Sequence, residues 1–154
     1  MPKKSSPYPI GTFLRIPLAD GTFGYGRALD YSYIAFYDFR TTDPRADLGE
    51  IESKPVLFIQ SVRQLDPQRW AALGKRPLSG EVAKPVVRYR QDLVDFRKCT
   101  IYDSEGMTRE ATPEECIGLE GASTWDKQHI EARILDHYMG RPNDMEIRGR
   151  VRLE

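Results

Sequence analysis

The stretch Gly11-Thr-Phe-Leu-Arg-Ile-Pro-Leu-Ala-Asp-Gly-Thr-Phe-Gly-Tyr-Gly-Arg-Ala-Leu29 predicts two strands, over about residues 11–18 and 22–29. Asp20-Gly21 is the signal for a tight turn between them, because glycine tolerates a positive φ. The second strand carries Gly24 and Gly26 on one face, although glycine weakens a strand. This face is nearly bare backbone, and we expect an aromatic side chain of the protein's own core to pack over it.

The following residues extend this pair of strands into a meander. Tyr33–Phe39 predicts an aromatic third strand, with one set of rings on the glycine face and the other at an interface or under a helix. Residues 40–54 are polar and predict a long loop. Val56–Val62 is the most apolar run and predicts a central strand. Asp66-Pro67 then opens a predicted short helix through Leu73, because aspartate caps helices and proline suits the first helical position.

The second half of the chain predicts shorter elements around one long helix. Thr112-Pro-Glu-Glu115 has the pattern of a capping box and predicts a short helix ending at Gly118. Ile130, Ile134 and Tyr138 recur at helical spacing. The predicted elements are a strand over 85–90, a hairpin over 98–111, a helix from 123 or 124 to 138 or 139, and a last strand over 146–153. Together they indicate an α+β fold: a mostly antiparallel, strongly bent or barrel-like sheet with a C-terminal helix packed on it.

Length and composition predict one domain over residues 10–154, after a flexible lead-in over residues 1–9. The chain has 23 basic and 23 acidic residues, so no net charge attracts it to nucleic acid or to a membrane. It contains no apolar run long enough to span a membrane, and the N-terminus lacks the apolar stretch of a secretory signal. We therefore expect a cytoplasmic protein in which Cys99 and Cys116 are reduced.

Motifs for catalysis, metal or cofactor binding are not recognisable. The glycines of residues 21–26 have the spacing GxxGxG and precede a strand, whereas a phosphate site needs a helix N-terminus there. His129 and His137 share a helix face with Arg133, and a cation between them opposes a metal. The favoured interpretation is that this helix face is exposed to solvent. We expect no enzyme, no metal and no cofactor.

Charge is patterned locally although its total is zero. The segment from Asp103 to Asp126, here called the acidic stretch, has seven acids against one base, Arg109. Residues 84–98 have five bases against two acids. Such segments are solvated faces or docking surfaces, since complementary charge speeds encounter and sets specificity. Arg88-Tyr-Arg90 and residues 148–152 could instead touch RNA, which requires a basic stripe with exposed aromatic residues.

The opening stretch, followed by Ile34-Ala-Phe-Tyr-Asp38, resembles the start of the immunity protein 26 family of bacterial polymorphic toxin systems. The pattern is a glycine, an apolar strand ending in Pro-Leu, an Asp-Gly turn, aromatic-Gly-aromatic-Gly-Arg and an Ile-Ala-Phe-Tyr-Asp-like strand. The residues of this fold motif are Gly11, Asp20, Gly21, Gly24 and Gly26. The resemblance covers about residues 11–39, and nothing beyond Val62 is carried over residue by residue.

The resemblance implies a non-enzymatic protein that binds a cognate toxin domain in the cytoplasm and neutralises it stoichiometrically. Many such toxins are nucleases with basic clefts, so acidic residues are the hypothesised contacts. They are Glu110, Glu114, Glu115, Glu120 and Asp126 in the acidic stretch, and Asp43, Asp47 and Glu50 in the 41–52 loop. Two alternatives remain: a barrel-like nucleic-acid-binding module, and a small enzyme with Arg27 and Asp38 at a pocket over the glycine strand.

Overall fold

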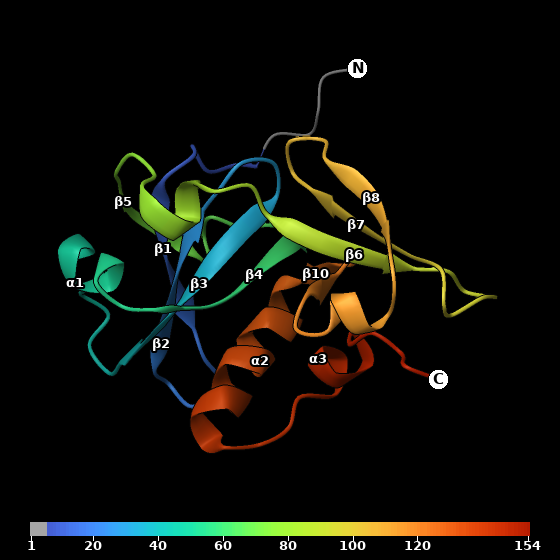
Figure 1. The fold of residues 1–154 in the computed structure, drawn as a ribbon. Coiled ribbons are helices and arrows are strands. Elements are labelled where there is room, and N and C mark those ends of the chain that lie inside the picture. Colours follow the sequence, from blue (N-terminus) through green and yellow to red (C-terminus); the bar gives the residue numbers. More distant parts are fainter. Residues whose placement is uncertain (1–5) are drawn as a thin grey trace. The chain divides into compact units, whose positions relative to one another are not determined.

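The computed structural model describes residues 6–154 and has the predicted α+β class, with mostly antiparallel strands and a helix near the C-terminus. The chain forms two compact units (Figure 1). The first comprises the chain up to Ala83 and Thr124–Asn143, and the second comprises Lys84–Ser123 and Asp144–Glu154. Residues 1–5 of the predicted lead-in lie outside the described residues. The single domain over residues 10–154 stays a prediction.

A six-stranded sheet with the order β10-β4-β3-β2-β1-β5 forms the first unit. Strands β1 to β4 are consecutive antiparallel neighbours, which confirms the predicted meander. Register shifts in β1, β2 and β3 bend this open sheet. The bounds are Thr12–Pro17 for β1, Phe23–Ala28 for β2, Tyr33–Thr41 for β3, Val56–Arg63 for β4, Ala71–Lys75 for β5 and Thr124–Asp126 for β10.

Both faces of this sheet are covered. Helix α2 (Lys127–Met139) buries Ile134 against the glycine face, and the ring of Phe36 on that face meets the buried Trp70 edge-on. On the other face, helix α1 (Leu48–Glu52) buries Ile51 in a cluster with the aromatic ring of Tyr37. The neighbours Phe36 and Tyr37 therefore enter different layers, as predicted for the two aromatic sets.

Each glycine of the opening motif has a local reason. A Cβ on Gly26 would lie 3.2 Å from the ring of Phe36, as expected, but at Gly24 it would lie 3.2 Å from Cγ2 of Ile134, an aliphatic residue of α2. At Gly11, which has a φ of 91°, the carbonyl of Arg76 occupies the space of a side chain. Gly21 has a φ of 85° in the turn that Asp20 closes with its carboxylate. A side chain at these positions would meet atoms or strain the backbone.

Three predictions for the first unit are wrong in detail. The 40–54 loop contains helix α1, because the carboxylate of Asp47 accepts a hydrogen bond from the third residue beyond it. The predicted helix after Asp66 is a single turn, and the chain continues as β5, which pairs with the free edge of β1. The long helix begins at Lys127, because Thr124–Asp126 pairs in parallel with β4.

A four-stranded sheet with the order β8-β7-β6-β9 forms the second unit and includes the predicted hairpin. The capping box between Thr112 and Glu115 forms, but the helix it starts, η2 (Glu114–Cys116), is a short 3-10 helix. The predicted last strand over 146–153 is wrong, because α3 (Asp144–Arg148) satisfies its backbone locally. The strand bounds are Val87–Gln91 for β6, Cys99–Asp103 for β7, Thr108–Ala111 for β8 and Glu120–Gly121 for β9.

Candidate functional site

The acidic residues predicted to contact a partner are divided between the two units. The second unit carries Glu110, Glu114, Glu115 and Glu120, whereas the first carries Asp43, Asp47, Glu50 and Asp126. The acidic stretch is therefore divided between the two units. Its last member belongs to the other unit, at the start of α2.

Most first-unit acids are engaged by their own neighbours. The carboxylate of Asp43 accepts a hydrogen bond from the backbone N–H of Arg45, which lowers the pKa of Asp43. Asp47 caps α1. The Asp126 carboxylate lies 2.6 Å from Nε of Arg63, and this hydrogen bond lowers the pKa of Asp126. These carboxylates stabilise local structure, and a partner would have to compete for them.

Three of the four second-unit acids are exposed. Glu110 on β8 and Glu114 at the start of η2 are exposed. Glu115 is also exposed, but its carboxylate lies 2.8 Å from Nη1 of Arg109, and this hydrogen bond lowers the pKa of Glu115. Glu120 is half-buried on β9. Glu110 and Glu114 are thus the most available acids of the predicted set on β8 and η2.

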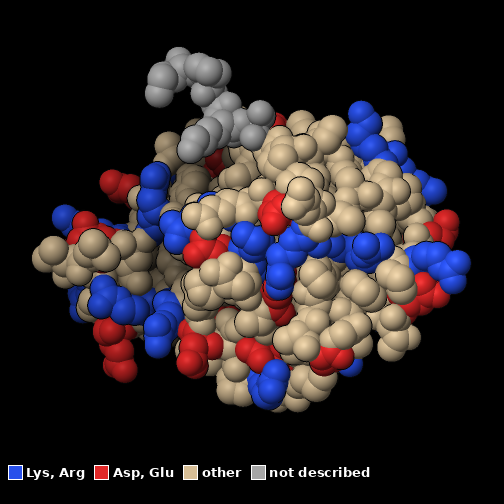
Figure 2. Space-filling view, turned by 180° about the vertical axis from the view of Figure 1, so that it is seen from behind, with Lys and Arg blue, Asp and Glu red and all other residues tan. Residues whose placement is uncertain are grey.

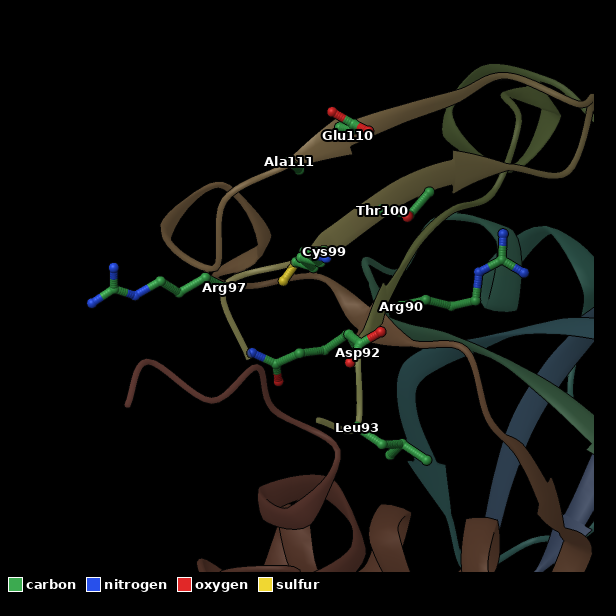
Figure 3. Close-up of a pocket in the computed structure, with 10 residues that line it drawn as sticks. Arg90, Asp92, Leu93, Arg97, Cys99, Thr100, Glu110 and Ala111 are labelled. Atoms are coloured by element: carbon green, nitrogen blue, oxygen red, sulfur yellow. The ribbon is translucent and has the colours of Figure 1, made fainter. Parts of the chain in front are cut away.

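A groove of about 740 Å³ lies in the second unit, and of the predicted site residues Glu110 lines it. In Figure 3, Arg90, Cys99 and Glu110 come from three strands, and the side chain of Arg97 extends outward from the β6–β7 loop. Bases therefore border the groove on the loop side and an acid borders it on β8. The lining residues are Arg90, Gln91, Asp92, Leu93, Arg97, Lys98, Cys99, Thr100, Glu110 and Ala111.

The β6–β7 loop, residues 92–98, is held by its own hydrogen bonds. Oδ1 of Asp92 accepts from the backbone N–H groups of Val94 and Asp95, each at 2.8 Å. These two hydrogen bonds lower the pKa of Asp92, and the bond from Asp95 has the larger effect. Nε2 of Gln91 donates to the carbonyl of Phe96 at 2.7 Å. The loop is therefore fixed by turn chemistry within the loop itself.

The tip of this loop carries the most exposed large apolar side chains of the described chain. Leu93 is 92% exposed and Val94 is 96% exposed, whereas the next, Ile117, is 61% exposed. The pattern Asp-Leu-Val-Asp carried the signal, since aspartate at the first position of a turn places the next two residues at its tip. Sequence reasoning missed this site because it followed charge and not exposed apolar residues.

The two cysteines belong to the core of the second unit. Cys99 and Cys116 are free and buried, and burial together with the neighbouring Cys99 raises the pKa of Cys116 to about 11. Such a thiol is a poor nucleophile at neutral pH. Within residues 6–154 no cluster of three metal-ligating side chains occurs, and no helix has both the length and the apolar character to cross a membrane.

The structure does not bring together Arg27 and Asp38, the two residues on which the enzyme alternative depends. Arg27 is 1% exposed and belongs to the α1 layer, where its guanidinium lies over Phe13. Asp38 instead accepts a hydrogen bond from the hydroxyl of Tyr138 on α2, at 2.9 Å. Ile134 occupies the space above Gly24. Arg27 and Asp38 therefore do not line a common pocket over the glycine strand.

The RNA alternative required exposed aromatic and basic side chains along β6. Arg88 and Tyr89 are instead 1% and 5% exposed, so this motif offers no stacking platform. On the face drawn in Figure 2, basic and acidic side chains are interspersed. A groove of one charge for a nucleic-acid backbone is not visible on that face.

Comparison with known proteins gives one match. The family model described as Immunity protein 26 matches residues 9–100 of this chain, which confirms the resemblance of the opening stretch. No curated protein and no solved structure matches. The matched region includes the meander of the first unit, β6 and the loop that follows β6.

Proposed function

Because this chain belongs to the immunity protein 26 family, we propose that it binds one cognate toxin domain in the cytoplasm and neutralises it by stoichiometric contact. Family membership is the observation that carries the proposal. An inhibitor of this kind acts through surface complementarity and affinity, so it needs no catalytic group and no cofactor. The lack of a common pocket for Arg27 and Asp38 agrees with such a role.

Exposed acids on β8 and η2 form the toxin-facing surface in this proposal. Glu110 and Glu114 are exposed. Glu115 lies beside Glu114 on η2, and Glu120 lies on the following element, β9. A basic toxin cleft would be attracted by these charges, since complementary charge raises association rates and selects the partner. Asp144 on α3 is exposed as well and is not among the predicted contacts, so it offers a comparison residue.

The test uses the purified C-terminal domain of the toxin encoded beside the gene for this chain. We expect the wild-type protein to bind it one to one and to restore growth of cells that express it. The variant Glu110→Lys/Glu114→Lys should bind about tenfold or more weakly at low salt, mainly through slower association, with a smaller difference at high salt.

Asp144→Lys is the control, because it reverses one exposed acid that is not among the predicted contacts. It should leave toxin affinity within about twofold of the wild-type value. Equal affinity of the double variant and wild type at low salt would remove the acidic surface from the proposal. A salt-dependent shift of labelled RNA without toxin binding would favour the nucleic-acid alternative.

A further inference from the structure

In the free protein, the exposure of apolar side chains to water at the tip of the β6–β7 loop is energetically unfavourable. Leu93 and Val94 are almost fully exposed, and they are adjacent. Scattered exposed apolar residues are common, but two large neighbouring ones at a protruding turn offer apolar area that a partner can bury. Removal of apolar surface from water is the dominant favourable contribution in most protein–protein association.

The rigidity of the loop makes this area usable. Asp92 receives two backbone N–H groups, Gln91 holds the carbonyl of Phe96, and the backbone N–H of Asp92 donates to the carbonyl of Lys98 at 2.9 Å. A loop that is ordered before binding loses little conformational entropy on binding. Leu93 and Val94 are thus presented in a fixed position.

Charges beside the tip restrict the chemistry of the partner. Arg90, Arg97 and Lys98 are exposed and line the groove beside the loop. The carboxylates of the two loop acids, Asp92 and Asp95, are turned to backbone N–H groups of their own loop. The bases are therefore the groups that face outward for an ion pair, and they fit carboxylates on the partner.

We propose that Leu93 and Val94 are the apolar anchor of the toxin interface and enter an apolar pocket of the toxin domain whose rim carries carboxylates. This inference rests on the proposed function and assigns it a second contact, beside the acids of β8 and η2. Glu110 borders the same groove, so the matching toxin surface carries acids on the loop side and bases on the β8 side.

Other occupants fit less well. An anionic membrane would be attracted by Arg90, Arg97 and Lys98, but two aliphatic side chains give only weak membrane affinity. Single-stranded nucleic acid is held by stacking on aromatic rings, which Leu93 and Val94 lack. An apolar protein pocket with carboxylates on its rim would contact both the apolar side chains of the tip and the adjoining basic side chains.

The deciding experiment compares toxin binding by wild type, by Leu93→Ser/Val94→Ser and by the control Ile147→Ser. The control alters another exposed large apolar residue, at 43%, in the same unit but outside the proposed toxin surface. Loss of two buried aliphatic contacts should weaken toxin binding about 100-fold, whereas the control should stay within about threefold. Hydrogen exchange of residues 91–98 in wild type should slow when the toxin domain is added. The thermal midpoint of the double variant should match wild type.

The outcomes separate the two proposals. If wild type binds the toxin domain and the serine double variant binds equally well, the anchor is wrong and the proposed function stands. If wild type does not bind, both are overturned. Co-sedimentation of wild type with phosphatidylserine vesicles that is lost in the double variant would assign the tip to a membrane and overturn the anchor.

Discussion

Replacement of Arg27 by methionine tests how the glycine strand is fixed to its layer. Arg27 follows Gly26 in the opening motif, and it is 1% exposed. Its Nη2 donates to the carbonyls of Arg76 at 3.0 Å and Pro77 at 2.8 Å, and its Nη1 lies 3.0 Å from a carboxylate oxygen of Glu52. Methionine keeps a comparable apolar stem and removes every donor.

The expected loss of stability follows from these contacts. Two hydrogen bonds from a charged group contribute about 1.5–3 kcal/mol each, and their loss leaves carbonyls without a donor. The ion pair adds at most about 1 kcal/mol, because Glu52 is 37% exposed and screened by solvent. Burial of the methionine side chain returns about 1–2 kcal/mol. Arg27→Met should therefore reduce the free energy of unfolding by about 1–6 kcal/mol.

Urea unfolding at equilibrium measures this difference, with Arg45→Met as the matched control. The Arg45 side chain is 90% exposed and pairs with Asp43 at 3.4 Å, so its replacement should change stability by less than about 0.5 kcal/mol. The thermal midpoint of Arg27→Met should fall by about 2–24 °C. A loss below about 1 kcal/mol, with an unchanged urea dependence, would refute the assignment of Arg27 as the link between β2, α1 and the chain after β5.

Two further substitutions and one thiol-reactivity measurement test other contacts, and a fourth test concerns the whole chain. Gly24→Val should lower stability by about 1–3 kcal/mol, because a Cβ there already lies 3.2 Å from Ile134. A smaller effect of Gly24→Val in an Ile134→Ala background than in wild type would confirm the clash, and an unaffected single variant would contradict it. The hydrogen bonds of its loop lower the pKa of Asp92 from its usual 3.8, so the stabilisation from this carboxylate is present at neutral pH and lost as the pH falls through the lowered pKa. Asp92→Asn should therefore flatten the acid limb of a plot of the urea midpoint against pH. An unchanged acid limb would exclude this contribution. The Cys116 thiol, with a pKa of about 11, should react with a disulfide reagent at pH 8 about 100-fold more slowly in the native protein than in urea, and equal rates would show that it is accessible. The chain passes between its units at Ala83, Ser123 and Asn143, so calorimetry should record one unfolding transition, and two transitions would argue against a single domain.

Sequence patterns predicted the elements whose bonds are local. The Asp20-Gly21 turn, the β1–β2–β3 meander and the capping box at Thr112 depend on hydrogen bonds between residues close in sequence. Such elements carry their own signals, because turn and cap geometry demands particular residues. The prediction of the two aromatic layers of β3 succeeded for a similar reason, since side chains alternate along a strand.

The errors lie where a distant partner decides between two local possibilities. The segment after Asp66 starts with a good helix cap, yet β1 has a free edge, and pairing along it produces β5. Thr124–Asp126 likewise adds to β4 before α2 begins. Local propensity is weak beside the backbone hydrogen bonds that an unpaired strand edge provides.

By itself, the sequence determined the α+β class, the glycine strand and the family, because turn residues and strand periodicity express the backbone directly. Only the tertiary structure decided which charges are available. The carboxylate of Asp126 is paired with Arg63, and the buried guanidinium of Arg27 donates to carbonyls some fifty residues away in the chain. Leu93 and Val94 are left exposed on a rigid loop. Exposure and pairing depend on groups that are distant in the chain, and the spacing of residues in a sequence does not record them.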